Sequence, residues 1–448
     1  MLITNATIFT NSQSRPWIED GAVYIEDGDI VEVGEKEDIE KKYRYEKKNE
    51  SLILNAKGHL LMPGMVNLHT HLCNSLMRGL NLNDSDPLVS DRISKRSRWK
   101  YDKTLDLESV YYSALVGAIE SVKSGVTMVF DHHSSPNAIK DSLNSIYSAV
   151  SSVGIRASLS YEISDRSGKQ KAIESIEENA AFRVKTSNLP NDMIHSMIGL
   201  NSSFTVSDDT IKEIRKVIPD KEIDFHINLA EGVEDNKDSY LRYGMSVANR
   251  LARCGILNSN TIAAHCVNLN DEDKDVLAMK NTIIVHNPES DMRNAIGKTD
   301  IKGLLGRGLT VGLGDAGFGY NMFQQLRISY LLYSDWKKEI SQFFSKTISS
   351  MLLKNNYSAV FRLTGIPLGK IEEGYKADLV ILDYPSPTPV ESGNFIEHLI
   401  TAGGIKSKVD YTIINGKIVV REGKVVTVSE EEIFETTRVL SQRILSYM

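Results

Sequence analysis

Leu60-Leu61-Met62-Pro63-Gly64-Met65-Val66-Asn67-Leu68-His69-Thr70-His71 is an apolar run that ends in two histidines separated by one threonine. Residues two apart on an extended strand point to the same face, so both imidazoles can reach one metal ion from a single rigid edge. Taken alone, the pair is equally compatible with two polar residues at the end of a strand. Residues elsewhere in the chain therefore have to decide whether the two histidines belong to a metal site or only end a strand.

The composition is that of an ordinary globular protein. The chain has 448 residues, of which 41% are hydrophobic and 25% are charged, and this is enough for one large domain and a smaller one. A formal net charge of -7 argues against nucleic acid or an anionic membrane as a partner. The first residues lack a basic segment followed by a long apolar stretch, so we expect a cytoplasmic protein without a secretory signal.

Both ends of the chain have the alternating pattern of antiparallel strands. In the N-terminal part, residues 21–34 alternate apolar and polar side chains around Asp27-Gly28, a pair typical of tight hairpin turns. In the C-terminal part, residues 411–420 have a similar pattern around Asn415-Gly416. We therefore predict antiparallel β-structure at both termini.

The central part of the chain alternates short apolar segments with helical patterns, which is typical of parallel βαβ units. Eight strands separated by helices are what a closed (β/α)8 barrel requires, so the predicted fold class is α/β with a TIM-type barrel. The expected strands are the run that ends at residue 69 and residues 126–131, 156–161, 196–201, 223–228, 261–265, 282–286 and 309–314.

Histidines stand at or near the ends of five of these strands. One such histidine is more often a hydrogen-bonded structural residue than a metal ligand, but five are difficult to explain without a common pocket. Because sites in barrels of this kind lie at the C-terminal ends of the strands, these side chains are predicted to share one site. They are His69 and His71, His132 and His133, His226, His265, and His286.

Five motifs at the strand ends identify a family. They are residues 62–71, Ala230-Glu231-Gly232, Ala264-His265-Cys266-Val267, Val285-His286-Asn287-Pro288-Glu289-Ser290 and Gly312-Leu313-Gly314-Asp315-Ala316-Gly317. On these motifs the chain resembles the amidohydrolase superfamily, in its cytosine-deaminase-like or chlorohydrolase-like branch, over nearly its whole length. A narrower similarity, to aminohydrolases associated with selenium metabolism, rests on residues 129–136 and 286–295.

The resemblance implies a barrel that holds one divalent transition metal, zinc or iron, beside a small β-sandwich formed by both termini. The implied division is residues 1–58 and 367–448, with a terminal helix, for the sandwich, and residues 59–366 for the barrel. The resemblance also suggests a homodimer. Its expected partner is a small-molecule substrate, with neither nucleic acid nor a membrane.

The same resemblance assigns roles to residues that match the family pattern. His69 and His71 match the first-strand metal ligands, Glu231 matches the glutamate that moves protons, and His265 matches the sixth-strand histidine that orients water or substrate. In such a site the metal lowers the pKa of bound water, and the carboxylate transfers the protons. Ammonia typically leaves from an amino-substituted carbon.

Two expected metal positions are changed in this chain. Asn228 stands where the family has a histidine, as a weak substitute, and Ala316 stands where it has an aspartate. His226 is a further candidate ligand, but it lies two residues earlier, about 6.6 Å along a strand. Asp315 is a candidate ligand and catalytic residue, but it is out of register by one position and reaches the pocket only if the strand end bulges or turns.

Other polar residues near strand ends are expected to bind the substrate. They are Tyr161, His133, Ser203 and His286. A basic and aromatic segment, residues 92–100, lies in the long loop after the first barrel strand. It could form a lid over an anionic or aromatic ligand, but a solvated charged loop is the more common explanation of such a segment.

Two functions of different classes remain open. The first is a metal-dependent aminohydrolase that hydrolyses a non-peptide C–N bond of a small amino-heterocycle or guanidine-like substrate. The second is a metal-deficient, non-catalytic relative that binds a ligand or takes part in an assembly. The residues that match the family favour the enzyme, whereas Asn228 and Ala316 favour the second function.

Overall fold

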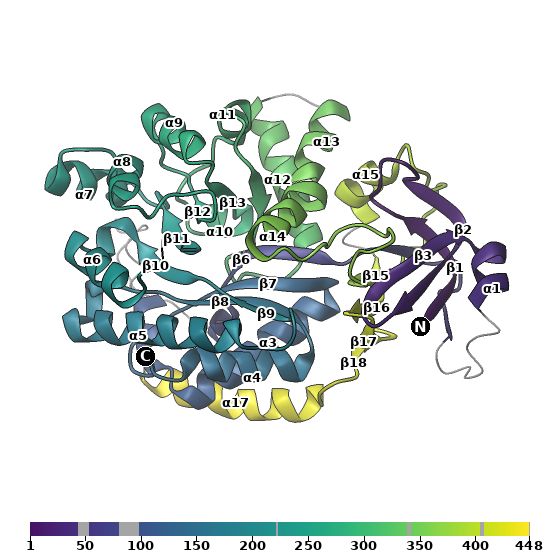
Figure 1. Cartoon of the computed structure of the whole chain (residues 1–448), viewed down its shortest axis with the longest axis horizontal. Helices are drawn as coiled ribbons and strands as arrows, with labels where there is room; N and C mark the ends of the chain where they lie inside the picture. The colour runs from purple at the N-terminus through teal and green to yellow at the C-terminus, as the bar shows by residue number, and fades with distance from the viewer. Residues whose placement is uncertain (44–52, 80–97, 221–222, 338–341, 404–406, 448) are drawn as a thin grey trace.

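The computed structural model describes residues 1–43, 53–79, 98–220, 223–337, 342–403 and 407–447. In these ranges it contains β-sheets of nine, five and four strands. Figure 1 shows the nine-stranded sheet at one side of a larger α/β body. Among the described helices, none has the length and apolar character needed to span a membrane.

The nine-stranded sheet joins the two ends of the chain, and we call it the terminal sheet. Its order is β18-β17-β16-β15-β5-β1-β2-β3, with β4 paired to β1. The C-terminal strands meet the N-terminal ones where β15 runs antiparallel to β5. The β-structure predicted at both termini is confirmed. The strands are β1 (Leu2–Phe9), β2 (Trp17–Glu26), β3 (Asp29–Glu35), β4 (Ile53–Asn55), β5 (Leu60–Pro63), β15 (Leu379–Asp383), β16 (Lys408–Ile414), β17 (Lys417–Arg421) and β18 (Lys424–Val425).

The apolar run before the two histidines is divided between two sheets. β5 pairs with β1 and β15 in the terminal sheet, whereas β6 (Met65–Thr70) pairs with β7 in the body. A Cβ atom at Gly64, between the two strands, would lie 2.2 Å from Cγ2 of Thr127, so the chain passes this point only with glycine. The change from terminal sheet to body therefore occurs at Gly64 and not after residue 58.

The central strands form the two parallel sheets of the body. Their orders are β6-β7-β8-β9 and β10-β11-β12-β13-β14. Each of the eight predicted segments overlaps an observed strand, and the fourth is split into β9 and β10. Beyond β6, the strands are β7 (Val126–His133), β8 (Arg156–Tyr161), β9 (Ile194–Ser196), β10 (Ile198–Ser202), β11 (Phe225–Leu229), β12 (Ile262–His265), β13 (Ile283–His286) and β14 (Val311–Leu313).

Helices follow most strands of the body and cover its outside (Figure 1). The helices of the body are α3 (Leu107–Lys123), α4 (Ser142–Val153), α5 (Lys169–Ser187), α6 (Asp208–Val217), α7 (Glu234–Tyr243), α8 (Val247–Arg253), α9 (Asp271–Met279), α10 (Pro288–Arg293), α11 (Ile301–Gly306), α12 (Met322–Lys337), α13 (Gln342–Ser350) and α14 (Asn356–Thr364). α1 (Lys36–Tyr43) and α15 (Phe395–His398) lie beside the terminal sheet.

The last helix packs on the body, although it follows the terminal sheet in sequence. α17 (Glu430–Tyr447) lies along α3 (Figure 1). Arg443 Nη2 lies 2.8 Å from a carboxylate oxygen of Asp106, and Lys123 Nζ lies 2.5 Å from Glu430. The terminal helix was predicted with the β-sandwich segment, but it packs along α3 of the body.

The two parallel sheets share an apolar interior. Leu68 of β6, Phe130 of β7 and Val285 of β13 belong to one buried cluster, together with residues of α14. Backbone hydrogen bonds also connect the sheets at their ends. The N–H groups of Asp315 and Ala316, just after β14, both donate to the carbonyl oxygen of His69 on β6, at 3.0 and 2.9 Å.

A buried arginine fixes the terminal sheet to the body. Arg156 of β8 is fully buried, and its guanidinium donates to Asp378, at 2.9 Å, and to Asp192, at 2.8 Å. Asp378 immediately precedes β15 and is 2% exposed. Removal of the guanidinium would leave this carboxylate buried without its cationic partner.

We therefore expect Arg156→Met to lower the free energy of unfolding by about 3–5 kcal/mol. Equilibrium urea unfolding followed by circular dichroism measures the change. The control is Arg183→Met, whose partner Asp220 is half exposed and whose loss should cost about 1 kcal/mol or less. Equal shifts in the two variants would contradict the role given to Arg156.

Candidate active site

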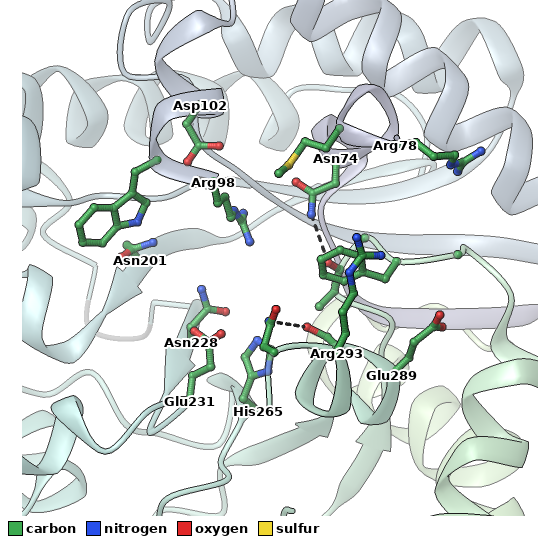
Figure 2. Close-up of a pocket in the computed structure, with 18 of the residues that line it drawn as sticks. Asn74, Arg78, Arg98, Asp102, Asn201, Asn228, Glu231, His265, Glu289 and Arg293 are labelled. Carbon is green, nitrogen blue, oxygen red and sulfur yellow. Dashed lines mark hydrogen bonds between the residues drawn. The ribbon is translucent and has the colours of Figure 1, made fainter. Parts of the chain in front are cut away.

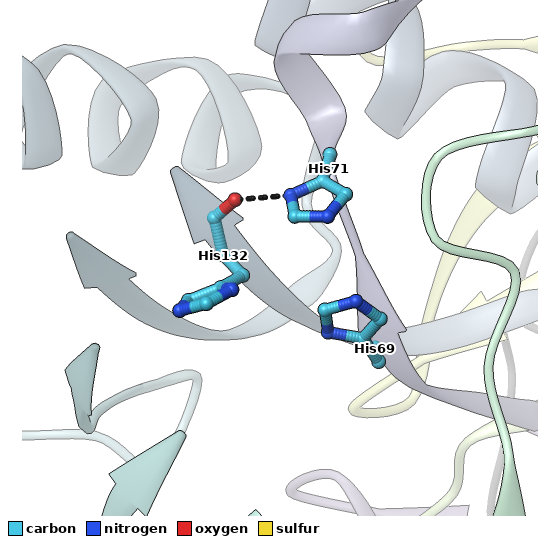
Figure 3. A group of neighbouring side chains, drawn as sticks. All are labelled: His69, His71 and His132. Carbon is cyan, nitrogen blue, oxygen red and sulfur yellow. Dashed lines mark hydrogen bonds between the residues drawn. The ribbon is translucent and has the colours of Figure 1, made fainter. Parts of the chain in front are cut away.

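Buried histidines from three strands lie together inside the body. His69 Nδ1 lies 2.8 Å from Nε2 of His226 on β11, and the rings of His226 and His132 stack with centroids 4.5 Å apart. Figure 3 shows the rings of His69 and His71 close together, edge to face, beside His132. Each of these side chains is at most 1% exposed. We call these four residues the histidine cluster.

Strand alternation decides which histidine of β7 joins the cluster. Met128 and Phe130 point into the apolar interior between the sheets, so His132, two residues further, points to the same side. His133 points to the opposite side, where its Nε2 lies 2.9 Å from Ser135 Oγ. His132 is therefore the β7 histidine that faces His69.

An irregularity in β6 turns its two histidines into the same space. Leu68 points into the apolar interior, so a regular strand would turn His69 away from it. The pairing of β6 with β7 changes register between Asn67 and Thr70, as a β-bulge does. Because alternation is broken here, Leu68 and the following histidine can both face inward.

The nitrogen atoms of the cluster suit a divalent transition metal. One ligand nitrogen each from His69, His71 and His132 lies within 4.8 Å of the others. Nε2 of His69 and both ring nitrogens of His132 are buried and have no hydrogen-bond partner among the residues that the structure describes. Burial and the neighbouring imidazoles hold the pKa of His69 well below its usual value, which keeps the ring neutral, as metal binding requires.

A cavity of about 860 Å³ opens beside the histidine cluster. Figure 2 shows Asn74 and Arg98 on one side of it and Asn228, Glu231 and His265 on the other. The ring centroid of His265 lies 5.4 Å from that of His69, so the cavity wall touches the cluster through His265. These residues lie at or beyond the carboxyl ends of the strands, or in the segment after β6.

His265 is held by a buried carboxylate. Its Nδ1 lies 2.7 Å from Oδ1 of Asp291, which is fully buried on α10. Burial alone would raise the pKa of Asp291, but attraction to His265 and hydrogen bonds from His265 and His286 outweigh it and lower this pKa. An N–H at Nδ1 therefore donates to Asp291, which fixes the orientation of the imidazole in the cavity wall.

Arg98 supplies a positive charge at the inner end of the cavity. Its Nη2 lies 3.3 Å from Glu162 and 2.9 Å from Nδ1 of His71. Burial opposes the charge, but Glu162 and Asp102 outweigh this effect and raise the pKa of Arg98. Trp99 also lines the cavity, and Arg166 stacks on its ring at 4.2 Å. Arg98 and Trp99 are therefore parts of the cavity wall. Arg92, Lys95 and Arg96, the basic residues at the start of the same segment, lie outside the described residues.

Comparison with known proteins identifies the family. A model described as the amidohydrolase family matches residues 60–419. The chain belongs to the amidohydrolase family. A curated 5'-deoxyadenosine deaminase of Methanopyrus kandleri is 30% identical over 435 residues, which are 96% of each chain. A 5-methylthioadenosine/S-adenosylhomocysteine deaminase of Bacillus cereus is 29% identical, and the match covers 97% of each chain.

Solved structures of two proteins share the fold of this amidohydrolase. An adenosine deaminase from Xanthomonas campestris with bound zinc has a TM-score of 0.83 at 22% identity, covering 99% of this chain and 98% of that chain. An atrazine chlorohydrolase from Arthrobacter aurescens complexed with zinc has a TM-score of 0.80 at 21% identity, covering 98% of this chain and 99% of that chain.

The two changed positions of this amidohydrolase both lie on the cavity. Asn228 is 5% exposed, and its Oδ1 has no hydrogen-bond partner within the described ranges. Ala316 has a left-handed backbone, with φ of 50°, and also lines the wall. The residue types at these positions thus place an amide and a methyl group beside the histidine cluster.

Asp315 is engaged in its own loop. Its two carboxylate oxygens accept hydrogen bonds from the backbone N–H groups of Gly317 and Tyr320, both at 2.8 Å. Asp315 is not a member of the group of metal-capable side chains around His69. Its side chain therefore stabilises the loop after β14, which is a sufficient reason for its burial.

The structure places the residues expected to bind substrate behind the cavity wall. His133 bonds to Ser135, Ser203 Oγ accepts a hydrogen bond from Arg250 at 2.9 Å, and His286 Nδ1 lies 3.2 Å from Thr299. Tyr161 lines a separate cavity of about 190 Å³. None of the four lines the large cavity among the described residues, whereas Asn201, Ser202 and Phe204, next to Ser203, do.

Three residues of this region have no individual role that the sequence motifs predict. His132 was recognised only as one of several strand-end histidines, although the alternation from Met128 would have selected it. Arg98 belongs to the basic segment 92–100, for which the sequence leaves both a lid and a solvated loop open. Asp291 lies within the motif that follows β13, but no sequence signal pairs it with His265, because the contact joins the end of β12 to α10 across 26 residues of chain.

Asp102 offers a test of the electrostatics beside the cavity. Burial raises the pKa of Asp102 to about 6, against the opposing effect of Arg98. The folded protein therefore keeps this proton to a higher pH than the unfolded chain, whose carboxyl has a pKa of about 3.9. The contribution of Asp102 to the free energy of unfolding consequently falls as the pH rises from about 4 to about 6.

Asp102→Asn removes this dependence. Relative to the wild type, the variant should gain about 1 kcal/mol of unfolding free energy between about pH 5 and about pH 7.5. Urea unfolding at both pH values measures the change. The exposed carboxylate variant Asp20→Asn should show no such gain, and a constant difference for Asp102→Asn would refute the prediction.

Proposed function

We propose that this amidohydrolase is a metal-dependent aminohydrolase that removes the exocyclic amino group of an adenosine-type nucleoside. The observation that carries the proposal is the convergence of Glu231 and His265 on a cavity whose wall, at His265, lies beside His69 of the histidine cluster. The names of the relatives, which are 5'-deoxyadenosine and 5-methylthioadenosine/S-adenosylhomocysteine deaminases, support an amino-substituted purine as substrate. A purine also fits the earlier expectation of a small amino-heterocycle.

We also infer that the two parallel sheets of the body close into a (β/α)8 barrel. The inference is supported by the hydrogen bonds from Asp315 and Ala316 to His69, which connect the end of β14 to β6. A parallel bridge between Ile163 and Leu200 connects the other edges, after β8 and in β10. The shared apolar interior is what a closed barrel of short parallel strands requires.

His69 and His71 would hold the metal from the edge of β6. A bound divalent ion, zinc or iron, would lower the pKa of a water molecule toward neutrality. Glu231 lines the cavity as the expected proton carrier: it takes a proton from the water as the oxygen adds to the amino-substituted carbon. It then delivers the proton to the amino nitrogen, which leaves as ammonia.

His265 acts from the opposite side of the inner cavity. Because Asp291 holds its Nδ1, the imidazole keeps one orientation and presents Nε2 to the oxygen that adds to the ring. Asn228, with an unpartnered buried oxygen on the cavity, is a candidate for contact with a substrate N–H group. The other expected features, a homodimer, a cytoplasmic location and an association with selenium metabolism, stay predictions.

Glu231→Gln tests the assignment. We expect zinc-loaded wild-type protein to release ammonia from 5'-deoxyadenosine or 5-methylthioadenosine, and the variant to lose about 10²- to 10⁴-fold in kcat with little change in KM. Coupled detection of ammonia measures both. Glu213→Gln, on the outside of α6, is the control and should keep the wild-type rate.

Absence of turnover by metal-loaded wild type on any of these nucleosides would refute the proposal. If calorimetry then still detected binding of the nucleosides, the non-catalytic, ligand-binding function would be supported instead.

A further inference from the structure

We propose that this chain holds its metal ion with three histidines, His69, His71 and His132, so that β7 supplies the ligand that β11 and β14 lack. The proposal rests on the metal dependence of the proposed function and goes beyond it in naming a third ligand outside the family pattern. These three residues, shown in Figure 3, would be a complete set of protein ligands for a catalytic zinc-type site, which needs three ligands and an open position.

The positions that carry the other metal ligands in the family pattern are unsuited to that role here. Asn228 offers a neutral amide oxygen, which is a poor ligand for a transition metal beside imidazoles. Ala316 offers no donor atom. Asp315, the adjacent carboxylate, already accepts backbone hydrogen bonds on both oxygens. A third ligand therefore has to come from another strand.

The geometry favours His132. Its ligand nitrogen and those of His69 and His71 all lie within 4.8 Å of one another. Zinc–nitrogen bonds of about 2.1 Å in a tetrahedral site place the ligand nitrogens about 3.4 Å apart. Small rotations of the imidazoles can close the remaining difference. β6 and β7 are neighbouring strands of one sheet, so their direct pairing holds the two sides of the site together.

The hydrogen bonds around the cluster leave the required nitrogens unused. His71 Nδ1 donates to the backbone carbonyl of His132, which leaves Nε2 for a metal. His69 Nδ1 pairs with His226, which likewise leaves Nε2. Neither nitrogen of His132 has a hydrogen-bond partner among the described residues, although the ring is fully buried. Buried polar atoms without partners are costly, and a bound cation satisfies them.

Charged neighbours complete the surroundings of the site. Oε1 of Glu162 lies 3.4 Å from Nδ1 of His132 and can orient this ring from behind, as carboxylates do for metal-binding histidines. Glu162 also offsets the charge of Arg98. When a metal binds Nε2 of His71, Nδ1 carries the hydrogen that it donates to the carbonyl oxygen of His132. The guanidinium of Arg98 then pairs with Glu162 and not with His71.

Metal affinity of single variants tests the proposal directly. The full-length protein is stripped of metal and titrated with Co²⁺, with the visible absorption of the bound ion as the readout, and zinc content after dialysis is measured separately. We expect one ion per chain in the wild type and a loss of affinity of at least about 100-fold in His132→Ala.

Two variants serve as matched controls for this loss. His133→Ala removes the neighbouring buried histidine on the opposite face of β7, and Asn228→Ala removes the donor at the family position. Both should retain the ion with affinity within about threefold of the wild type, since neither residue is a ligand in the proposed site. Far-UV circular dichroism establishes that each variant is folded.

A measurement without substitutions keeps the proposal testable if His132→Ala does not fold. X-ray absorption of the zinc-loaded wild type counts the imidazoles bound to the metal, and three are expected. Two imidazoles, unchanged affinity in His132→Ala, loss of the ion in Asn228→Ala, or a wild type that binds no ion would each overturn the proposal. Three imidazoles with no release of ammonia would leave this site standing and refute the proposed function instead.

Discussion

The carbonyl oxygen of His69 accepts backbone hydrogen bonds from both Asp315 and Ala316, and the arrangement of the site depends on this junction. It ties the end of β14 to β6, so the loop that follows β14 lies against the two histidines. It also fixes the register of that loop. With Ala316 in a left-handed conformation at the junction, the carboxylate of Asp315 turns to its own loop and the methyl group of Ala316 lines the cavity.

The order of strands in the body could be predicted because buried parallel strands are short apolar runs bounded by turns. Particular residues depart from this pattern. The run before His69 reads as one strand, but Gly64 divides it between two sheets, because only tertiary contact with Thr127 imposes a glycine there. Similarly, no local sequence pattern predicts the register change in β6 that turns the histidines inward.

The candidate site was predictable to the extent that it follows strand periodicity. His69, His71, Glu231 and His265 came from motifs, and the two-residue alternation from Met128 also selects His132 over His133. The pairs His265–Asp291 and Arg98–Glu162 could not be predicted from the sequence, because each joins two separate segments of the chain. His226 was expected to lie one layer deeper than the metal, and its hydrogen bond to His69 makes it a member of the histidine cluster.

The antiparallel pairing of β5 with β15 has a consequence for how the molecule folds. The N-terminal strands of the terminal sheet leave the ribosome first. β5 can pair with β15 only after the whole α/β body has been synthesised. Pairings between such distant segments form slowly, because the loop between them must be closed first. During synthesis one edge of β5 is therefore unpaired, and an unpaired strand edge is a site at which nascent chains aggregate.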